Sequence, residues 1–350
     1  MKKGDRVRLG LSGLGSFAIV IANAVKKSKN AQLVTCFDII PENRKRYTEQ
    51  FGCDQEESYE ALVARDDVDG VLLILPNNLH AEQAILAAEH GKHVYVLKPI
   101  ANTMSDGKRM IAACEKAGVV LMIGHPRRRH AASRKVKELV DQGVIGRPIM
   151  VEGNASSRQG FELTPDKFRW KGDDSGCPAG SLMTIGIHDV DMFNYILGPI
   201  KAVFALFNKL YIPAEVEDVM TTVCQFESGI LGYLGSNFAS PRSDWMYFYG
   251  TEANLLWTIP PFDLSFDDRH LVAAAKPPAT RLTIVEKGKG EREIPLNPIE
   301  PYVEEMEEFS HCIQTGDHPE TDGQGALVAL AYIRAAIESA RTGKLVKIEI

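Results

Sequence analysis

A short apolar run that leads directly into a glycine-rich turn constrains the fold of this chain most strongly. Residues 7–11 are apolar enough for a buried strand, and Gly13, Gly15 and Ala18 then open a stretch with apolar residues at helical spacing. Glycines at these positions allow a tight turn and let a pyrophosphate approach the N-terminus of a helix. The pattern predicts a dinucleotide-binding turn of the GxGxxA form.

An acidic residue follows at the position where such a turn needs one. A second apolar strand, residues 32–37, ends in Asp38, roughly 20 residues beyond the glycines, where a carboxylate can bind the ribose hydroxyls of adenosine. The same carboxylate repels a 2′-phosphate and favours NAD over NADP, whereas the basic residues 44–46 weaken that preference. A turn role before Pro41 is the alternative for Asp38.

Strands and helices continue to alternate through the first third of the chain. The pattern predicts strands at 71–75, 94–97 and 119–123 and helices at 81–90 and 104–117. This spacing is typical of an α/β fold with a doubly wound parallel sheet. We therefore expect a Rossmann domain over residues 1–124.

One lysine stands at the end of a predicted strand in this domain. The stretch from Val94 to Pro99 places Lys98 at the carboxyl edge of the sheet, where open α/β folds bind ligands. Pro99 stops the strand, so the ammonium group is expected at the rim of the sheet. The alternative for Lys98 is a solvated surface lysine.

The remaining residues, 125–350, have a different pattern. They predict helices at 132–142 and 325–341 and strands at 149–156, 203–210, 219–226, 230–238, 245–249 and 254–258. Turn residues separate these strands, as in a mostly antiparallel or mixed sheet. We expect a second, α+β domain here, although residues 260–279 show no pattern that we can assign.

Charge and cysteine content exclude several classes of protein. The 350 residues carry a formal net charge of −6 without a long basic run, which argues against nucleic acid or an anionic membrane as the main partner. Six cysteines without a CxxC pair predict reduced thiols rather than a zinc knuckle or a disulfide framework. Glycines interrupt the apolar run near the N-terminus, and no stretch reaches the roughly 18 apolar residues of a membrane span. We expect a soluble, cytoplasmic protein.

The motifs resemble the family of glucose-fructose oxidoreductase, inositol dehydrogenase and rhizopine catabolism proteins (Gfo/Idh/MocA). The resemblance covers nearly the whole chain and rests on GxGxxA at 13–18, LPNNLHAEQA at 75–84, GKHVYVLKP at 91–99, GHPRR at 124–128, GVIGRP at 143–148, GSLMTIGIHDVDMFNYILG at 180–198 and ESARTGKLVKI at 338–348. It implies an N-terminal Rossmann domain and a C-terminal α+β domain with a large open sheet, whose free face often forms homodimer or homotetramer contacts.

The resemblance also implies a reaction and a set of site residues. Family members typically transfer a hydride between NAD(H) or NADP(H) and a hydroxyl carbon of a sugar, cyclitol or related compound. The family positions predict Lys98 at the reacting hydroxyl and His188 as proton acceptor or donor. They predict cofactor binding by Gly13, Gly15, Ser16, Phe17, Asp38, Leu75, Pro76, Asn77, His80, Leu97 and Lys98.

Three positions depart from the family pattern. Leu97 replaces the glutamate that usually precedes the lysine, and Pro126 replaces the usual asparagine before the two arginines. Thr184 replaces the aspartate expected four residues before the histidine, so a carboxylate partner of the site is missing. These changes bear more on the substrate than on the cofactor.

A helix predicted at 182–197 places polar residues along one face. Thr184, His188, Asp191 and Tyr195 follow one another at spacings of four, three and four, opposite an apolar face. Hydride leaves a carbinol carbon easily only if the hydroxyl proton is removed as the carbonyl forms, which needs a base of near-neutral pKa, and a histidine at position 188 suits that role. Lys98 would stabilise the negative charge that develops on oxygen. Asp191 either substitutes for the missing aspartate or forms a cap or salt bridge.

Other residues before this helix are candidates for binding substrate. Arg158, Arg169 and Trp170 suit a carbohydrate or carboxylate, because sugar faces stack on indole and guanidinium groups bind oxygen atoms. Thr184 is a further candidate for binding substrate. Asp244 is a weaker candidate. No third ligand accompanies His188 and Asp191, so no metal site is expected.

Two further functions remain open from the sequence. A redox-neutral glycosidase or lyase would use NAD transiently and form no net NADH. A non-catalytic regulator would keep the fold and bind dinucleotide or sugar, and the changes at Leu97, Pro126 and Thr184 give this alternative some support. The retention of both Lys98 and His188 favours an NAD-dependent dehydrogenase.

Overall fold

The computed structural model describes residues 6–163, 169–260 and 280–350, except for the side chains of residues 162 and 169. The chain divides into two compact units, each described by itself below. The first contains residues up to 126 together with residues 300–327, and the second contains most of the chain from residue 127 to 299 and residues 328–350.

The first unit is built on a six-stranded parallel sheet in the order β3-β2-β1-β4-β5-β6. Its strands are β1 (Val7–Ser12), β2 (Ala31–Phe37), β3 (Asp54–Gln55), β4 (Gly70–Leu73), β5 (His93–Leu97) and β6 (Leu121–Gly124). Its helices are α1 (Ala18–Lys27), α2 (Pro41–Phe51), α3 (Tyr59–Ala64), η1 (Asn77–Leu79), α4 (His80–Glu89), α5 (Met104–Ala117) and α8 (Pro301–Thr315). The strand order reverses between β1 and β4, which is where doubly wound sheets bind ligands.

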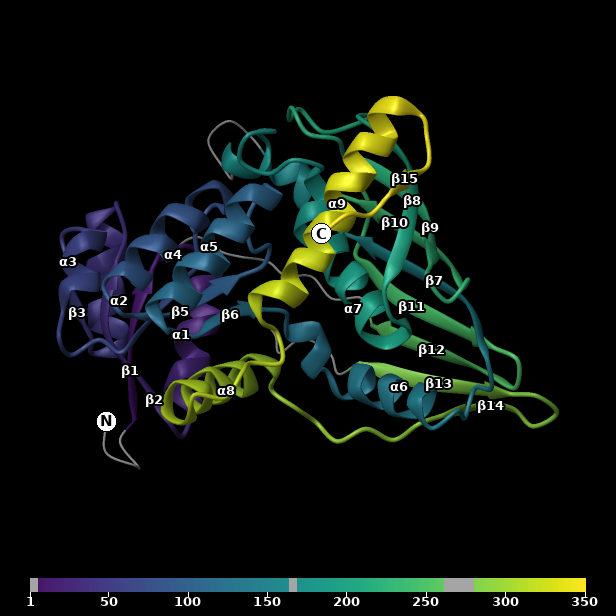
Figure 1. Cartoon of the computed structure of the whole chain (residues 1–350), viewed down its shortest axis with the longest axis horizontal. Coiled ribbons are helices and arrows are strands. Elements are labelled where there is room, and N and C mark those ends of the chain that lie inside the picture. The colour runs from purple at the N-terminus through teal and green to yellow at the C-terminus, as the bar shows by residue number, and fades with distance from the viewer. Residues whose placement is uncertain (1–5, 164–168, 261–279) are drawn as a thin grey trace. The chain divides into compact units, whose positions relative to one another are not determined.

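Helix α8 joins this unit although it lies far along the chain. Met306 and Phe309 of α8 are buried in the same apolar core as Val7 and Leu9 of β1. Glu305 accepts a hydrogen bond of 2.8 Å from the hydroxyl of Tyr95, in β5. The core of the first unit is therefore completed by a helix from the C-terminal third of the sequence (Figure 1).

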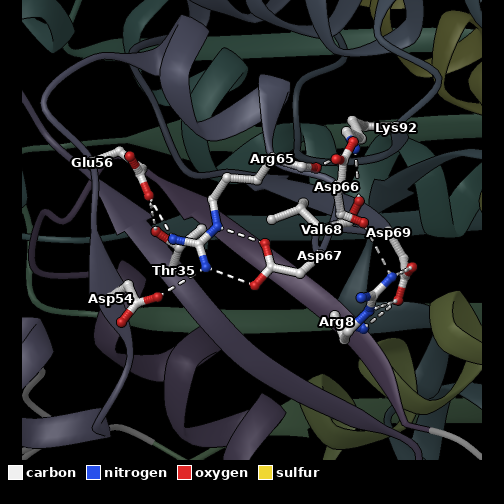
Figure 2. A network of polar contacts seen from close by, with 10 residues as sticks. All are labelled: Arg8, Thr35, Asp54, Glu56, Arg65, Asp66, Asp67, Val68, Asp69 and Lys92. Carbon is white, nitrogen blue, oxygen red and sulfur yellow. Dashed lines mark hydrogen bonds and ion pairs between the residues drawn. The ribbon is translucent and has the colours of Figure 1, made fainter.

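A charged network lies at the edge of the first sheet (Figure 2). Arg65 contacts Asp54 at 2.9 Å, Glu56 at 2.6 Å and Asp67 at 2.7 Å, so one guanidinium group bridges three carboxylates. Arg8, at the start of β1, pairs with Asp69 at 2.6 Å. These pairs join β3, the end of α3 and the loop that precedes β4.

The second unit is built on a nine-stranded sheet in the order β14-β13-β12-β11-β7-β10-β9-β8-β15. Among the described strands of this sheet, β7 and β10 pair in parallel and the other neighbours pair antiparallel. The strands are β7 (Pro148–Ser156), β8 (Ile200–Asn208), β9 (Val219–Phe226), β10 (Leu231–Asn237), β11 (Ser243–Gly250), β12 (Ala253–Ile259), β13 (Arg281–Glu286), β14 (Gly290–Glu293) and β15 (Val346–Lys347).

Helices and helical turns cover one face of this sheet. They include η2 (Pro126–Arg129), α6 (Ala131–Asp141), η5 (Leu182–Gly186) and α7 (Ile187–Leu197), with the short turns η3 (Gln159–Glu162) and η4 (Arg169–Lys171). Helix α9 (Gly323–Thr342) begins in the first unit, and its C-terminal half packs on the second, where Tyr332 lies 2.6 Å from the hydroxyl of Thr222. The strands alternate buried and exposed residues, as expected for a sheet covered on one face.

The predicted fold class, a Rossmann sheet followed by a mostly antiparallel sheet, is confirmed. The predicted helix at 182–197 is partly wrong, because its first turn, Leu182–Gly186, is a π-helix. The prediction also missed α2, α3, α8 and the strands β3, β13, β14 and β15. All six cysteines are free thiols, and all of them are buried. Within the described ranges, no helix is both long and apolar enough to span a bilayer.

Candidate active site

The glycine turn after β1 lies against the end of β4. Gly13 has a φ of +84°, and a Cβ atom there would come within 2.4 Å of the carbonyl oxygen of Ile74, so no other residue fits without a shift of the backbone. By contrast, Gly15 is exposed, and a Cβ atom there would meet no atom within 4 Å. The turn therefore combines close strand packing with an open surface at the start of α1.

Asp38 is tied directly to this turn. Its carboxylate accepts hydrogen bonds from the backbone N–H of Leu14 at 2.7 Å and of Ile40 at 2.9 Å. These contacts fix the carboxylate at the carboxyl end of β2, next to the glycine turn, in the position that a ribose-binding acid needs. Ser16 and Phe17, which are also predicted to bind the cofactor, follow in the turn. Ser16 is partly exposed, and the ring of Phe17 packs edge-on against that of Tyr302, with 5.6 Å between the ring centres.

The segment after β4 contains a buried polar group without a partner. Leu75 and Pro76 are partly exposed, whereas Asn77 is buried, and its Nδ2 has no hydrogen-bond partner in the parts of the chain that the structure describes. A buried amide donor without an acceptor is costly, by about 1–3 kcal/mol, so a ligand acceptor is a natural partner for it.

His80 connects this segment to the loop that carries the predicted lysine. Its Nδ1 lies 2.9 Å from the carbonyl oxygen of Pro99, and its Nε2 lies 3.2 Å from that of Leu75. Burial lowers the pKa of His80 to about 4, so the ring is neutral and donates to only one of the two carbonyls. The shorter contact favours the Nδ1–H tautomer, bonded to Pro99. All of these contacts are with the main chain.

Lys98 lies immediately after β5, as predicted. Both Leu97 and Lys98 are partly exposed, and Pro99 behind them is buried. Burial is the main cause of the low pKa of His80, and the positive charge of Lys98 is a smaller one. The loop after β5 therefore presents an ammonium group from a backbone that His80 supports.

These residues of the first unit fit NAD. The open surface at Gly15 leaves room for a pyrophosphate at the start of α1, and Asp38 is placed for ribose hydroxyls. Asn77 offers a buried donor that lacks an acceptor among the described residues. The chemistry of the donors and the shape of the turn therefore agree with the predicted dinucleotide site.

In the second unit, an unusual stretch of backbone precedes His188. Ala179 has a φ of +59°, a left-handed conformation that L-residues other than glycine rarely adopt, and the π-helix Leu182–Gly186 follows. Both features occur most often at functional sites. His188 is the second residue of α7 and is partly exposed. Thr184 is buried, and its hydroxyl donates to the carbonyl of Gly180 at 2.9 Å.

A buried ion network joins α7 to two other segments. Arg127 pairs with Asp189, the residue after His188, and with Asp244 at 2.8 Å. Arg242 also pairs with Asp244, at 2.8 Å. Burial raises the pKa of Asp189 to about 7 against the opposing attraction of Arg127. The sequence analysis missed Arg127 and Asp189; only the repeated arginine of the GHPRR motif marked this segment.

A second ion pair anchors the same helix two residues further on. Arg128 donates to both carboxylate oxygens of Asp191, at 2.9 and 2.6 Å, and its guanidinium carbon lies 5.0 Å from the centre of the Tyr195 ring. Of the two roles considered for Asp191, the structure supports the salt bridge. Consecutive arginines of η2 therefore hold the first two turns of α7, at Asp189 and Asp191.

The structure places the other predicted substrate residues as follows. Arg158 is exposed and precedes η3, and Trp170 is partly exposed in η4, with the Lys171 ammonium 5.5 Å from its ring centre. Arg169 begins η4, but its side chain lies outside the described residues. Asp244 is buried in the ion network. Among the residues that the structure describes, no group of three or more His, Cys, Asp or Glu side chains is placed to hold a metal ion.

Comparisons with known proteins agree with this geometry. Residues 7–125 match the model of the oxidoreductase family with an NAD-binding Rossmann fold, and residues 133–256 match the GFO/IDH/MocA C-terminal domain. The 1,5-anhydro-D-fructose reductase of Ensifer adhaerens is 28% identical over 98% of each chain. The D-xylose 1-dehydrogenase (NADP(+)) 2 of Haloferax volcanii is 30% identical over 83% of this chain and 84% of that protein.

A solved structure is similar over its whole length. The crystal structure of aldose-aldose oxidoreductase from Caulobacter crescentus, complexed with glycerol, superposes with a TM-score of 0.85 at 27% identity, over 98% of this chain and 99% of that chain. Sequence and structure comparisons thus agree over both units. This chain belongs to the GFO/IDH/MocA family of oxidoreductases and carries that family's NAD-binding Rossmann fold at residues 7–125.

Proposed function

We propose that this protein is a dehydrogenase that transfers a hydride between NAD and a hydroxyl-bearing carbon of a sugar, cyclitol, polyol or glycoside. The observation that carries the proposal is the combination, in one unit, of a dinucleotide turn between β1 and α1 with an ammonium group at the carboxyl end of β5. Similar proteins named for carbohydrate substrates support the substrate class. NAD, when bound, supplies the hydride acceptor.

In this proposal, Lys98 and His188 carry the acid–base chemistry. Lys98 holds the reacting hydroxyl and stabilises the negative charge that develops on its oxygen. His188 accepts the hydroxyl proton as the carbonyl forms and returns it in the reverse direction. Because Asp191 is engaged with Arg128, the orientation of His188 depends on the anchoring of α7 by Arg127 and Arg128.

The contacts of the basic residues after Asp38 support a preference for NAD over NADP, because each of these side chains already has a partner within the protein. Lys45 is exposed and lies 4.0 Å from Glu49. Arg46 donates to the carbonyl of Leu14 at 3.4 Å, and the buried Arg44 donates to the carbonyl of Asp38 at 2.8 Å. The acid at Asp38 then dominates the binding of the ribose.

We propose that the second unit binds substrate and assembles with a second copy of the chain. An exposed apolar patch on its sheet supports the assembly. Neighbouring strands expose large apolar side chains on one face of the sheet: Leu206, Val223, Leu231 and Tyr233. Tyr233 and Val223 are directly paired across β10 and β9, so the patch is continuous. A homodimer or homotetramer would cover this face. Light scattering on wild type and on the Leu231→Asp variant tests the assembly; a monomeric wild type would contradict it.

The six buried, free thiols support a cytoplasmic location for the enzyme. The division of function that we propose assigns cofactor binding to residues 1–124 and substrate binding with assembly to residues 125–350, of which residues 300–327 pack in the first unit. Cell fractionation tests the cytoplasmic location. The substrate dependence of variants in each part of the chain tests the division of function.

NADH formation across a panel of sugars, cyclitols, sugar acids and glycosides, with NAD and separately NADP, tests the activity. We expect turnover with one chemical class, and we expect Lys98→Met to lower kcat at least about 100-fold while NAD binding changes little. Lys108→Met, which changes an exposed lysine of α5, is the matched control. Wild-type activity in Lys98→Met would contradict the role of Lys98.

The same panel separates the alternatives. Release of an aglycone without net NADH would identify a redox-neutral glycosidase or lyase. No turnover with any compound, together with sugar-dependent or NAD-dependent association with another protein, would identify a regulator.

A further inference from the structure

The ion pair between Arg44 and Glu57 lies beside the ribose-binding end of β2. Arg44 is the fourth residue of α2, and its side chain is only 8% exposed, whereas that of Glu57 is 81% exposed. We infer that Glu57 is a specificity-determining residue, which keeps the enzyme selective for NAD by engaging the charge of Arg44. This inference deepens the proposed preference for NAD and rests on it.

Two nitrogens of the Arg44 guanidinium have fixed partners. Nη1 donates to the carbonyl oxygen of Asp38 at 2.8 Å, and Nη2 donates to Glu57 at 2.6 Å. The first contact places the guanidinium at the backbone of the residue that receives the adenosine ribose. The second contact sets a carboxylate against the same cation. The positive charge next to the ribose site is therefore compensated.

The 2′-phosphate of NADP would meet a different environment in the absence of Glu57. With Glu57 in place, the phosphate faces the carboxylate of Asp38 and an arginine that is already paired. Without the charge of Glu57, Arg44 keeps its bond to the Asp38 carbonyl and becomes an uncompensated cation. A dianionic phosphate gains from such a cation, whereas the uncharged ribose hydroxyls of NAD gain little.

The neighbouring basic residues provide a matched comparison on the same helix. Lys45 pairs with Glu49 at 4.0 Å, and both of these side chains are largely exposed. Glu49→Gln removes one negative charge from α2, just as Glu57→Gln removes one from the segment after it, but it releases a solvated lysine instead of a buried arginine. A general effect of net charge would act equally in both variants.

Isothermal titration of NAD⁺ and NADP⁺ into wild type, Glu57→Gln and Glu49→Gln tests the inference without any substrate. We expect Glu57→Gln to tighten NADP⁺ binding roughly 3- to 10-fold and to change NAD⁺ binding less than about 2-fold, with Glu49→Gln close to wild type. Glu57 is exposed, so the variant should fold. The effect should decrease in 0.5 M salt, since it is electrostatic.

A second variant identifies the residue through which Glu57 acts. In an Arg44→Met background, Glu57→Gln should no longer tighten NADP⁺ binding. Equal effects of Glu57→Gln and Glu49→Gln, no effect of either, or a persistent effect without Arg44 would each overturn the inference. Tighter binding of NADP⁺ than of NAD⁺ by the wild type would contradict the proposed NAD preference instead, so the two failures are distinguishable.

Discussion

The Arg65 network of the first unit and the Arg127 network of the second use the same chemistry in opposite surroundings. Arg65 is 22% exposed and bridges three carboxylates that reach solvent to different extents (Figure 2). Arg127 is 7% exposed, and its partners Asp189 and Asp244 are almost fully buried. Water can replace a lost partner in the first network, but it cannot do so in the second.

The pKa values of the carboxylates differ accordingly. Hydrogen bonds from Arg65 lower the pKa of Asp67. Burial works to raise the pKa of Asp69, but the hydrogen bonds from Arg8 hold it below its usual range. In the second network, burial prevails and raises the pKa of Asp189 to about 7. The comparison teaches that exposure, more than the number of ion pairs, decides what a charge contributes to stability.

Breaking the buried network should have the largest effect. Arg127→Met leaves the buried Asp189 without its cation and leaves Asp244 with Arg242 alone, and we expect it to lower the free energy of unfolding by about 3–5 kcal/mol. Urea denaturation followed by fluorescence measures this loss. Adding Asp189→Asn and Asp244→Asn to the same variant should restore part of the stability. A loss below about 1 kcal/mol for Arg127→Met alone would remove the distinction between the two networks.

Breaking the pair between Arg128 and Asp191 should cost less stability than breaking the buried network and more than breaking the exposed one. Asp191→Asn should cost about 2 kcal/mol, because Arg128 keeps some access to water and its contact with the Tyr195 ring. Because Asp191 lies one turn after His188, we also expect kcat to fall several-fold while KM changes little. Steady-state kinetics with the substrate found in the panel check this result. A change confined to KM would speak against a positioning role.

The pH dependence of folding stability should have opposite signs for the two networks. The folded protein raises the pKa of Asp189 from 3.8 to about 7, so the native state binds more protons than the unfolded state between these values. Relative to Asp189→Asn, the wild type should therefore lose stability as pH rises from 4 to 7, by about 3 kcal/mol. Chemical denaturation at several pH values measures the difference. A difference that is constant from pH 4 to 7 would show that Asp189 does not titrate there.

Breaking the exposed network should have the smallest effect. We expect Arg65→Ala to cost about 1 kcal/mol at low salt and less in 1 M NaCl. Since the pKa of Asp67 is lowered in the folded state, its contribution is present above pH 4 and is lost as pH falls below this value. Thermal unfolding at both salt concentrations tests the prediction. A loss as large as that of Arg127→Met would refute the comparison.

Local patterns in the sequence predicted the elements that bind the dinucleotide. The helix at 104–117 and the strand at 219–226 were predicted with the bounds that the structure shows. Gly13 and Asp38 lie where the turn pattern placed them, because a glycine turn and an acid after the next strand are close in sequence and depend on few distant contacts. Helix α2 was missed because its mean hydropathy is low and few of its residues are apolar.

The pairings that join distant segments were not predictable from one sequence. Arg127 and Asp189 are 62 residues apart, and no local spacing signals that they meet. The π-helix before His188 was missed because its residues fit a continuous α-helix equally well. The role of Asp191 depended on the same long-range contact, since only the position of Arg128 separates a salt bridge from a partner of His188.

Helix α8 has a consequence for the order in which the protein is made. The strands of the first sheet leave the ribosome early, but Met306 and Phe309, which complete their core, follow only after roughly 170 further residues. At about 5–20 residues per second, the first unit waits on the order of 10–30 s with part of its apolar surface uncovered. During this interval the nascent sheet exposes apolar surface and unpaired strand edges that favour aggregation.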